Sequence, residues 1–283
     1  MAHLPLKTIA VPEATVEVYD QWLGELGQQL EAPGADWNAI ARDTLFQLYY
    51  PGYRDYAALV EDPATPAGAK ASLLALDPRN ITLEPEYYAD VDSERFARVK
   101  PLLWLWQRYD HSPLGGTNVY VGVRFRNLLA PHIFARCGRN FKCFQFTEFS
   151  YGYNMDVGDD VVVHRHVLLD DRGGITLGNG VSIADYANIY SHTHSIDDQK
   201  EVINAPTILE DGVRITYHAT VLAGTRVGTH AMVGACAVAT KDVRPYHVNV
   251  GIPAKSVAVK SYAPAEARST QRVAHHREGD SGS

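Results

Sequence analysis

The sequence lacks the features that typify membrane-spanning, secreted and nucleic-acid-binding proteins. No apolar run is long enough to cross a bilayer, and residues 1–20 have no basic flank followed by a long apolar core. The three cysteines form no CxxC pair, and an odd number is a poor basis for a disulfide framework. A net charge of −7 argues against nucleic acid or an anionic membrane as the main partner. We therefore expect a soluble, cytoplasmic protein in a reducing compartment.

The part of the chain before about residue 136 has the apolar spacing of amphipathic helices. In residues 14–30, apolar side chains recur at steps of three and four residues, which places them on one buried stripe. Residues 36–50 show a similar pattern, and so do residues 92–110, although Pro101 must bend or divide that last helix. A Pro- and Ala-rich connection separates the second helix from the third. We predict a mainly helical domain over residues 1–136, and its composition does not indicate a chemistry.

From residue 137 the pattern changes, and an apolar residue appears at about every sixth position. A strand alternates its side chains between two faces, so a six-residue unit that buries one aliphatic side chain forms a short strand and a corner. Three units complete a triangular coil of about 18 residues that returns the chain above its starting point. Two extra residues in every third unit place the first coil starts, Cys137, Val157 and Leu177, 20 positions apart.

Stacking these coils predicts three inner columns of apolar side chains, each buried only against its neighbours in the stack. Cysteines fall in or beside the columns, and we interpret them as small core residues. Because chance would not fill 15 registered positions with apolar side chains, we predict a parallel β-helix over residues 137–260. The columns are Cys137, Val157, Leu177, Leu209 and Val227; Cys143, Val163, Ile183, Ile215 and Val233; and Phe149, Leu169, Ile189, Val221 and Ala239.

Residues 150–256 resemble the hexapeptide-repeat acyltransferases, whose domain is a left-handed β-helix. The resemblance rests on "LGNGVSIADYANIYSHTHSID", a loop, "TILEDGVRITYHATVLAGTRVGTHAMVGACAVATKDV" and "GIPAKSV", which follow in this order the branch that includes maltose and galactoside acetyltransferases. With the helical pattern of residues 1–136, the left-handed β-helix that the resemblance implies predicts an α+β chain: a mainly helical N-terminal domain followed by a left-handed parallel β-helix. The helical half has no counterpart that we recognise in that branch.

The same resemblance implies a mechanism and an assembly. Enzymes of this family are homotrimers that bind acetyl-CoA in a groove between neighbouring β-helices. A histidine at the end of a coil, just before a protruding loop, removes the proton from the acceptor hydroxyl. His194, in "THSID", matches that histidine, whereas His192 does not. An imidazole suits a general base near neutral pH, and direct attack on the thioester requires no acyl-enzyme.

Cofactor-binding residues also follow from the resemblance. A backbone N–H near Tyr217 would donate to the oxyanion of the tetrahedral intermediate. Gly234 and Ala235 are small enough to let the pantetheine arm lie against the coil. Lys241 in "ATKDV" and Lys255 in "GIPAK" match basic positions of the family, and they would meet the phosphates of CoA.

The acceptor site departs from the family pattern. Its sugar-acetylating members use an Asn and an Asp in the acceptor pocket, where this chain has His164 and Arg172. We interpret "VHRHVLLDDRGG", including Asp171, as an acceptor wall with different hydrogen-bonding groups. Beside the cofactor, residues 214–216 read Arg-Ile-Thr where relatives often carry Trp-Ile-Gly. The acceptor of the maltose or galactoside enzymes therefore does not carry over.

The expected activity is transfer of acetyl from acetyl-CoA to a hydroxyl of a sugar or saccharide-like acceptor, with no metal. Three alternatives stay open: N-acetylation of an amino sugar or xenobiotic, a γ-carbonic-anhydrase-like zinc enzyme built on the many histidines, and a non-catalytic trimeric scaffold. The expected partners are acetyl-CoA, a small hydroxyl-bearing acceptor and two further copies of the chain. We expect residues 261–283 to form a disordered tail, with His275–His276 solvated.

Overall fold

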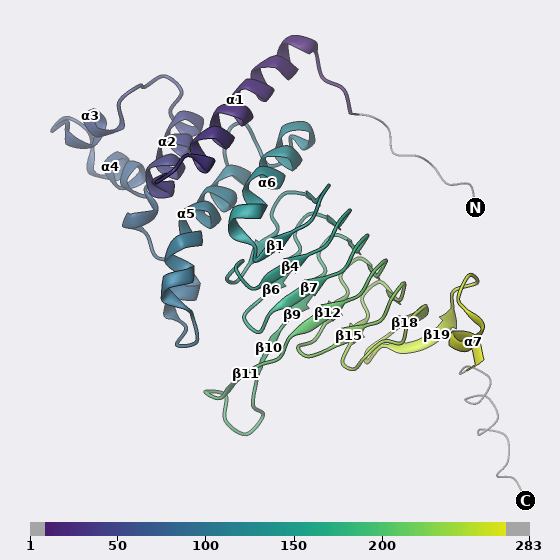
Figure 1. The fold of residues 1–283 in the computed structure, drawn as a ribbon. Helices are drawn as coiled ribbons and strands as arrows, with labels where there is room; N and C mark the ends of the chain where they lie inside the picture. Colours follow the sequence, from purple (N-terminus) through teal and green to yellow (C-terminus); the bar gives the residue numbers. More distant parts are fainter. Residues whose placement is uncertain (1–8, 270–283) are drawn as a thin grey trace, which may run out of the picture. The chain divides into compact units, whose positions relative to one another are not determined.

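A computed structural model of the chain describes residues 9–269 (Figure 1). The chain divides into two compact units at the boundary between Ile133 and Phe134. This boundary lies three residues before the one that the sequence indicated. No helix of the described residues is both long and apolar enough to cross a membrane.

The first unit is helical, as expected. Two of the predicted helices, α1 and α2, fall within one residue of their expected ends, and α5 runs through Pro101 without a break. Buried side chains on both sides of Pro101 hold this helix together, which outweighs the one hydrogen bond that the proline removes. The helices are α1 Glu13–Glu31, α2 Trp37–Tyr49, α3 Tyr56–Glu61, α4 Ala67–Leu74, η1 Pro78–Asn80, η2 Glu84–Tyr87, α5 Ser93–Asp110 and α6 Val119–Ile133.

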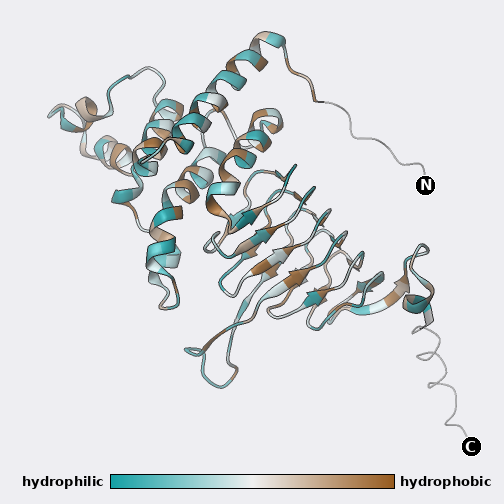
Figure 2. Ribbon diagram, viewed as in Figure 1, coloured by the Kyte–Doolittle hydropathy of each residue, from teal (hydrophilic) through white to brown (hydrophobic). Residues whose placement is uncertain are grey.

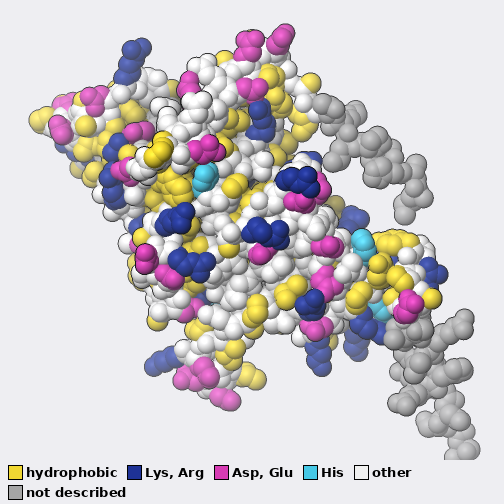
Figure 3. Space-filling model, in the orientation of Figure 1, with side chains coloured by type: hydrophobic (Ala, Val, Ile, Leu, Met, Phe, Trp, Pro, Cys, Tyr) yellow, Lys and Arg dark blue, Asp and Glu magenta, His cyan; other side chains and the backbone are white. Residues whose placement is uncertain are grey.

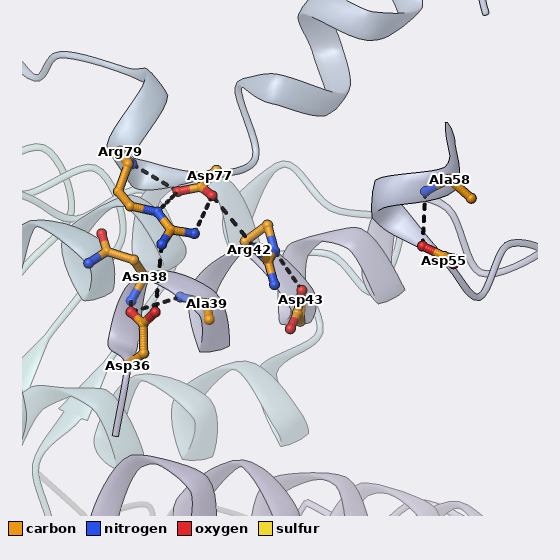
Figure 4. Close-up of polar contacts among 9 residues, drawn as sticks. All are labelled: Asp36, Asn38, Ala39, Arg42, Asp43, Asp55, Ala58, Asp77 and Arg79. Atoms are coloured by element: carbon orange, nitrogen blue, oxygen red, sulfur yellow. Dashed lines mark hydrogen bonds and ion pairs between the residues drawn. The ribbon is translucent and has the colours of Figure 1, made fainter. Parts of the chain in front are cut away.

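Charged side chains fasten α2 to η1. The Asp77 carboxylate is buried, and it accepts hydrogen bonds from Arg79 Nε at 2.9 Å and Arg79 Nη2 at 2.6 Å (Figure 4). Arg42 Nη1, from α2, approaches the same carboxylate at 3.8 Å. These arginines lower the pKa of Asp77 although its burial acts in the opposite direction. Asp36 caps the N-terminus of α2 by accepting hydrogen bonds from two backbone N–H groups. The charged network of Asp36, Arg42, Asp77 and Arg79 therefore has a structural role.

The second unit is a parallel β-helix of three sheets. The first sheet contains β1 Arg136–Cys137, β4 Met155–Val157, β7 Ile175–Leu177, β12 Thr207–Leu209 and β15 Arg226–Val227. The second contains β2 Lys142–Cys143, β5 Val162–Val163, β8 Ser182–Ile183, β13 Arg214–Ile215, β16 Met232–Val233, β18 His247–Val250 and β19 Lys255–Val259. The third contains β3 Glu148–Phe149, β6 Leu168–Asp170, β9 Asn188–Tyr190, β14 Thr220–Val221 and β17 Val238–Ala239.

All three predicted columns are present in the register of these sheets. Cys137, Val157 and Leu177 are paired in the first sheet, and the other two sheets align their columns in the same way. Every column residue except the half-buried Cys137 is buried. Figure 2 shows these apolar stretches as brown segments that recur from coil to coil. The hexapeptide period therefore predicted the core correctly, residue by residue.

The corner between the second and third sheets carries a stack of aromatic rings. Phe146, His166, Tyr186 and His218 occupy equivalent corner positions, all with positive φ. Successive ring centroids lie 4.9, 4.7 and 4.9 Å apart, and the rings are nearly parallel. A left-handed backbone conformation costs free energy for residues with such side chains. Stacking between their rings offsets part of this cost and so stabilises the corner. Two histidines that had supported a zinc-enzyme alternative thus have a structural position.

Two segments depart from the regular coil. β10 His192–His194 and β11 Val202–Asn204 form an antiparallel hairpin that projects from the β-helix (Figure 1). After β19, a short helix, α7 Ala265–Ser269, occupies part of the segment expected to be a disordered tail. Residues 270–283 of that expected tail, with His275–His276, lie outside the described residues.

Candidate functional site

His194 lies on the hairpin, and its side chain is exposed. Its Nδ1 is 2.6 Å from the backbone carbonyl oxygen of Gln199, five residues further along the loop. A carbonyl oxygen only accepts hydrogen bonds, so Nδ1 carries a proton, and in the neutral ring the lone pair then lies on Nε2. The loop thus holds the ring in the tautomer that a general base requires.

His192 has a different partner, which the sequence did not indicate. Its Nδ1 is hydrogen-bonded to Oδ2 of Asp170, which lies on β6 of the preceding coil. The Asp170 side chain is only 4% exposed, and Ser150 Oγ donates to its other oxygen at 2.7 Å. His192 and Asp170 are 22 residues apart in sequence, so no local spacing could have indicated the pair. Their contact depends on where the chain leaves the third sheet to form the hairpin.

The base of the hairpin is held by Ser191. Its Oγ donates to the backbone oxygen of Asp170 at 2.6 Å and accepts from the backbone N–H of Gly173 at 2.9 Å. Its carbonyl oxygen accepts from Ala205 N at 2.8 Å, where the chain returns from the hairpin. A methyl group on Gly173 would lie 2.1 Å from the Ser191 oxygen, so only glycine fits there.

Asp171 lies inside the unit and not on an acceptor wall. Its side chain is fully buried, and its carboxylate accepts from the backbone N–H groups of Tyr151 at 2.6 Å and Asn154 at 3.1 Å. Burial raises its pKa to about 6, and the backbone donors limit that rise. This residue therefore closes the 151–154 corner, which corrects its expected role in substrate binding.

Replacing Asp171 with asparagine should destabilise the protein by about 1–3 kcal/mol, because an amide nitrogen would face a backbone N–H that now has an acceptor. A folded-state pKa of about 6 lies above the ordinary 3.8. The unfolded chain therefore loses its proton first as pH rises, and this residue's contribution to stability falls between those two values. The variant should lack that fall. Urea unfolding at several pH values measures both effects, with the exposed Asp197→Asn as control.

The two other acceptor-wall residues occupy different environments. His164 is half-buried, and its ring stacks on Phe144 with centroids 5.1 Å apart. Arg172 is buried, with 8% of its surface exposed, and its backbone oxygen accepts from the Asn154 side chain at 3.2 Å. A direct contact between an acceptor and either residue remains a prediction.

Most residues expected to bind CoA lie on the surface. Tyr217, Ala235, Lys241 and Lys255 are exposed, and within the described residues the Tyr217 backbone N–H has no hydrogen-bond acceptor. That free donor is compatible with an oxyanion site. Figure 3 shows basic and acidic side chains interspersed on the visible face, so phosphates would need individually placed lysines.

Gly234 differs from this group because it is buried. A methyl group there would lie 2.6 Å from Val250 Cγ1, and its N–H donates to Asn249 O at 2.7 Å. Close packing of β18 therefore explains the glycine without reference to a cofactor. A contact between Gly234 and the pantetheine arm stays a prediction.

The histidines of the described chain do not gather into a metal site. Across residues 9–269 there is no group of three or more His, Cys, Asp or Glu side chains arranged to hold a metal ion. His247 is buried, with Nδ1 2.6 Å from Ser256 Oγ, and desolvation lowers its pKa. On the hairpin, the ring centroids of His192 and His194 lie 5.6 Å apart, and His192 contacts the buried Asp170 carboxylate.

Comparisons with known proteins relate the chain to acetyltransferases, although no protein-family model matches the sequence. The galactoside O-acetyltransferase of Escherichia coli (strain K12) is 27% identical over 139 residues, which are 48% of this chain and 68% of that enzyme. Other curated acetyltransferases are matched over less than two thirds of their length.

Two solved structures share the fold. A maltose O-acetyltransferase from Clostridium difficile 630 has a TM-score of 0.53 at 24% identity, over 61% of this chain and 91% of that one. A hexapeptide-repeat containing acetyltransferase from Vibrio cholerae O1 biovar eltor, complexed with acetyl coenzyme A, has a TM-score of 0.53 at 21% identity, over 65% and 98%. The expected fold, a helical region followed by a left-handed parallel β-helix, is thereby confirmed.

Proposed function

We propose that the protein is a CoA-dependent acetyltransferase that acetylates a hydroxyl of a sugar or saccharide-like acceptor, with His194 as general base. The observation that carries the proposal is the hydrogen bond from His194 Nδ1 to Gln199 O, which leaves Nε2 free on an exposed hairpin. The galactoside and maltose O-acetyltransferases among the relatives support the reaction class. The bound acetyl coenzyme A of the Vibrio cholerae structure supports the cosubstrate.

The proposed reaction needs no covalent enzyme intermediate. His194 Nε2 takes the proton of the acceptor hydroxyl as its oxygen bonds to the thioester carbon. The Tyr217 N–H donates to the oxygen that becomes negative in the tetrahedral intermediate. When the carbon–sulfur bond breaks, the imidazolium returns the proton to the CoA sulfur. Atoms and charge balance, and the enzyme ends in its starting state.

The active assembly that we propose is a homotrimer, in which acetyl-CoA lies between neighbouring β-helices as the family resemblance implies. In that arrangement the exposed positions of Lys241 and Lys255 leave both ammonium groups available to the CoA phosphates. Gly234 and Ala235 would lie along the pantetheine arm. His164 and Arg172 would lie near the acceptor.

An acceptor screen with radiolabelled acetyl-CoA tests the activity. Galactosides, maltose, an amino sugar and buffer alone should be compared, with CoA release followed in parallel. Label on the neutral sugars supports O-acetylation, whereas label confined to the amino sugar would favour N-acetylation. If no acceptor is labelled and CoA does not bind, the proposed activity is wrong and the non-catalytic trimeric scaffold is favoured.

Replacing Lys241 or Lys255 with alanine should raise the KM for acetyl-CoA by about three- to tenfold while kcat changes little. Each lysine would contribute a charge-assisted hydrogen bond to phosphates remote from the reacting carbon. Steady-state kinetics with varied acetyl-CoA measure the split, and Lys70→Ala, on α4 of the helical unit, is the matched control. A three- to tenfold fall in kcat with unchanged KM would contradict this prediction and would indicate that the lysines act at the reacting carbon.

A further inference from the structure

The strand β10 presents two histidines on the same face. His192 and His194 are two residues apart, and alternate side chains of a strand point the same way. Their ring centroids lie 5.6 Å apart, with the planes at 78°. The rings are thus neighbours at the point where the proposed acceptor hydroxyl would lie.

Both rings use the same nitrogen, Nδ1, for their hydrogen bond with the protein. His194 Nδ1 donates to Gln199 O, and His192 Nδ1 donates to the Asp170 carboxylate. Within the described residues, His192 Nε2 has no hydrogen-bond partner in the protein. It is also not one of the buried polar atoms that lack a partner, so it is exposed to solvent. Each imidazole therefore presents Nε2 for contact with another molecule.

Asp170 gives His192 a property that His194 lacks. Its carboxylate is buried, and within the described residues His192 is the one basic side chain that contacts it. Because Nδ1 is engaged by this carboxylate, Nε2 is the ring atom left to form a hydrogen bond with a hydroxyl. Ser150 Oγ and the Ser191 contacts to the Asp170 backbone fix the carboxylate from the other side. His192 is therefore held rigidly for recognition.

We propose that His192, positioned by Asp170, binds a second hydroxyl of the acceptor, adjacent to the hydroxyl that His194 deprotonates. Adjacent hydroxyl oxygens on a sugar ring are about one hydrogen-bond length apart, and each imidazole adds a bond of about 2.8 Å on its own side. Imidazoles that each bond to one of two such hydroxyls can therefore be up to about 8 Å apart, and ring centroids 5.6 Å apart lie within that reach. The acceptor class is thus a compound with two neighbouring hydroxyls, and this inference rests on the proposed function.

The test uses the full-length protein with methyl β-galactopyranoside and its monodeoxy analogues. His192→Asn keeps a donor for Asp170, because an asparagine amide nitrogen occupies about the place of Nδ1, but it removes Nε2. His166→Asn is the matched control, since that histidine lies in the corner stack and asparagine tolerates positive φ.

The wild type should favour the parent sugar over the analogue that lacks the neighbouring hydroxyl by about tenfold in kcat/KM. His192→Asn should bring this ratio close to one by lowering the rate with the parent sugar, while His166→Asn should leave it unchanged. An unchanged ratio in His192→Asn overturns the inference. Equal loss with every acceptor also overturns it, because His192 would then be the base.

A binding measurement separates failure of this inference from failure of the proposed function. Methyl β-galactopyranoside should shift the imidazole NMR signals of His192 in protein labelled with ¹⁵N-histidine, without acetyl-CoA. If no sugar is acetylated yet the His192 signal moves, the proposed reaction fails and diol binding stands. If acetylation proceeds and the His192 signal does not move, diol binding fails and the proposed function stands.

Discussion

Replacing His194 with asparagine should lower kcat by about 10²- to 10⁴-fold, the usual cost of losing a general base. The asparagine amide can still donate to Gln199 O, as Nδ1 does, so the hairpin keeps its local contact. What the variant loses is Nε2, the one atom that can take the acceptor proton. Single-turnover assays with acetyl-CoA and a galactoside measure the chemical step directly.

The binding of CoA should survive this substitution, because His194 lies on the hairpin and Lys241 and Lys255 lie on other segments of the chain. Calorimetric titration with CoA checks that point, and His218→Asn is a control in the corner stack. Wild-type turnover in His194→Asn would contradict the base assignment. A simultaneous loss of CoA affinity would indicate misfolding and not lost chemistry.

The β-helix could be predicted from sequence because its core depends on a local rule. One inward side chain in six fixes strand, corner and register together, so the hexapeptide period alone aligns Val163, Ile183 and Ile215 as they are paired in the second sheet. The aromatic corner stack followed the same period, yet it was missed. Phe146 is half-buried and His166, Tyr186 and His218 are exposed, so the stack carries no apolar burial signal.

The candidate site was predicted less completely, for a physical reason. His194 could be proposed because "THSID" resembles the family sequence that precedes a protruding loop. The contact between His192 and Asp170 could not, since it joins two coils through the geometry of that excursion. Asp171 was expected on the acceptor wall because it lies in "VHRHVLLDDRGG". Four backbone donors, among them Tyr151 and Asn154, instead hold it inside.

In the helical unit, the secondary structure could be predicted from the sequence, but the contacts between its elements could not. Its helices could be predicted from apolar spacing, but the charged network around Asp77 requires residues from η1 and α2 to meet in space. Pro101 was expected to interrupt α5, whereas burial of the neighbouring side chains keeps the helix continuous. Local rules thus identify elements, and long-range contacts decide how their exceptions are resolved.

Replacing Gly173 with alanine should destabilise the protein by about 3 kcal/mol or more, the upper range for an overpacked site. The added methyl group would lie 2.1 Å from Ser191 O and 2.7 Å from Ala205 N, and both are backbone atoms that no rotamer change can move. The hairpin base must therefore shift, and with it the bonds of Ser191 to Asp170 and Gly173. Thermal and urea unfolding measure the loss.

Gly24→Ala in α1 supplies the matched control for this substitution, because nothing lies within 4 Å of its added methyl group. Alanine in a helix interior should stabilise the protein by about 0.5–1 kcal/mol. In whatever fraction of Gly173→Ala folds, acetyl transfer should fall more than CoA affinity, since the displaced hairpin carries both His192 and His194. Wild-type stability in Gly173→Ala would show that the hairpin base is not rigid. It would contradict the argument that the contacts of Ser191 and Gly173 hold His192 and His194 in place.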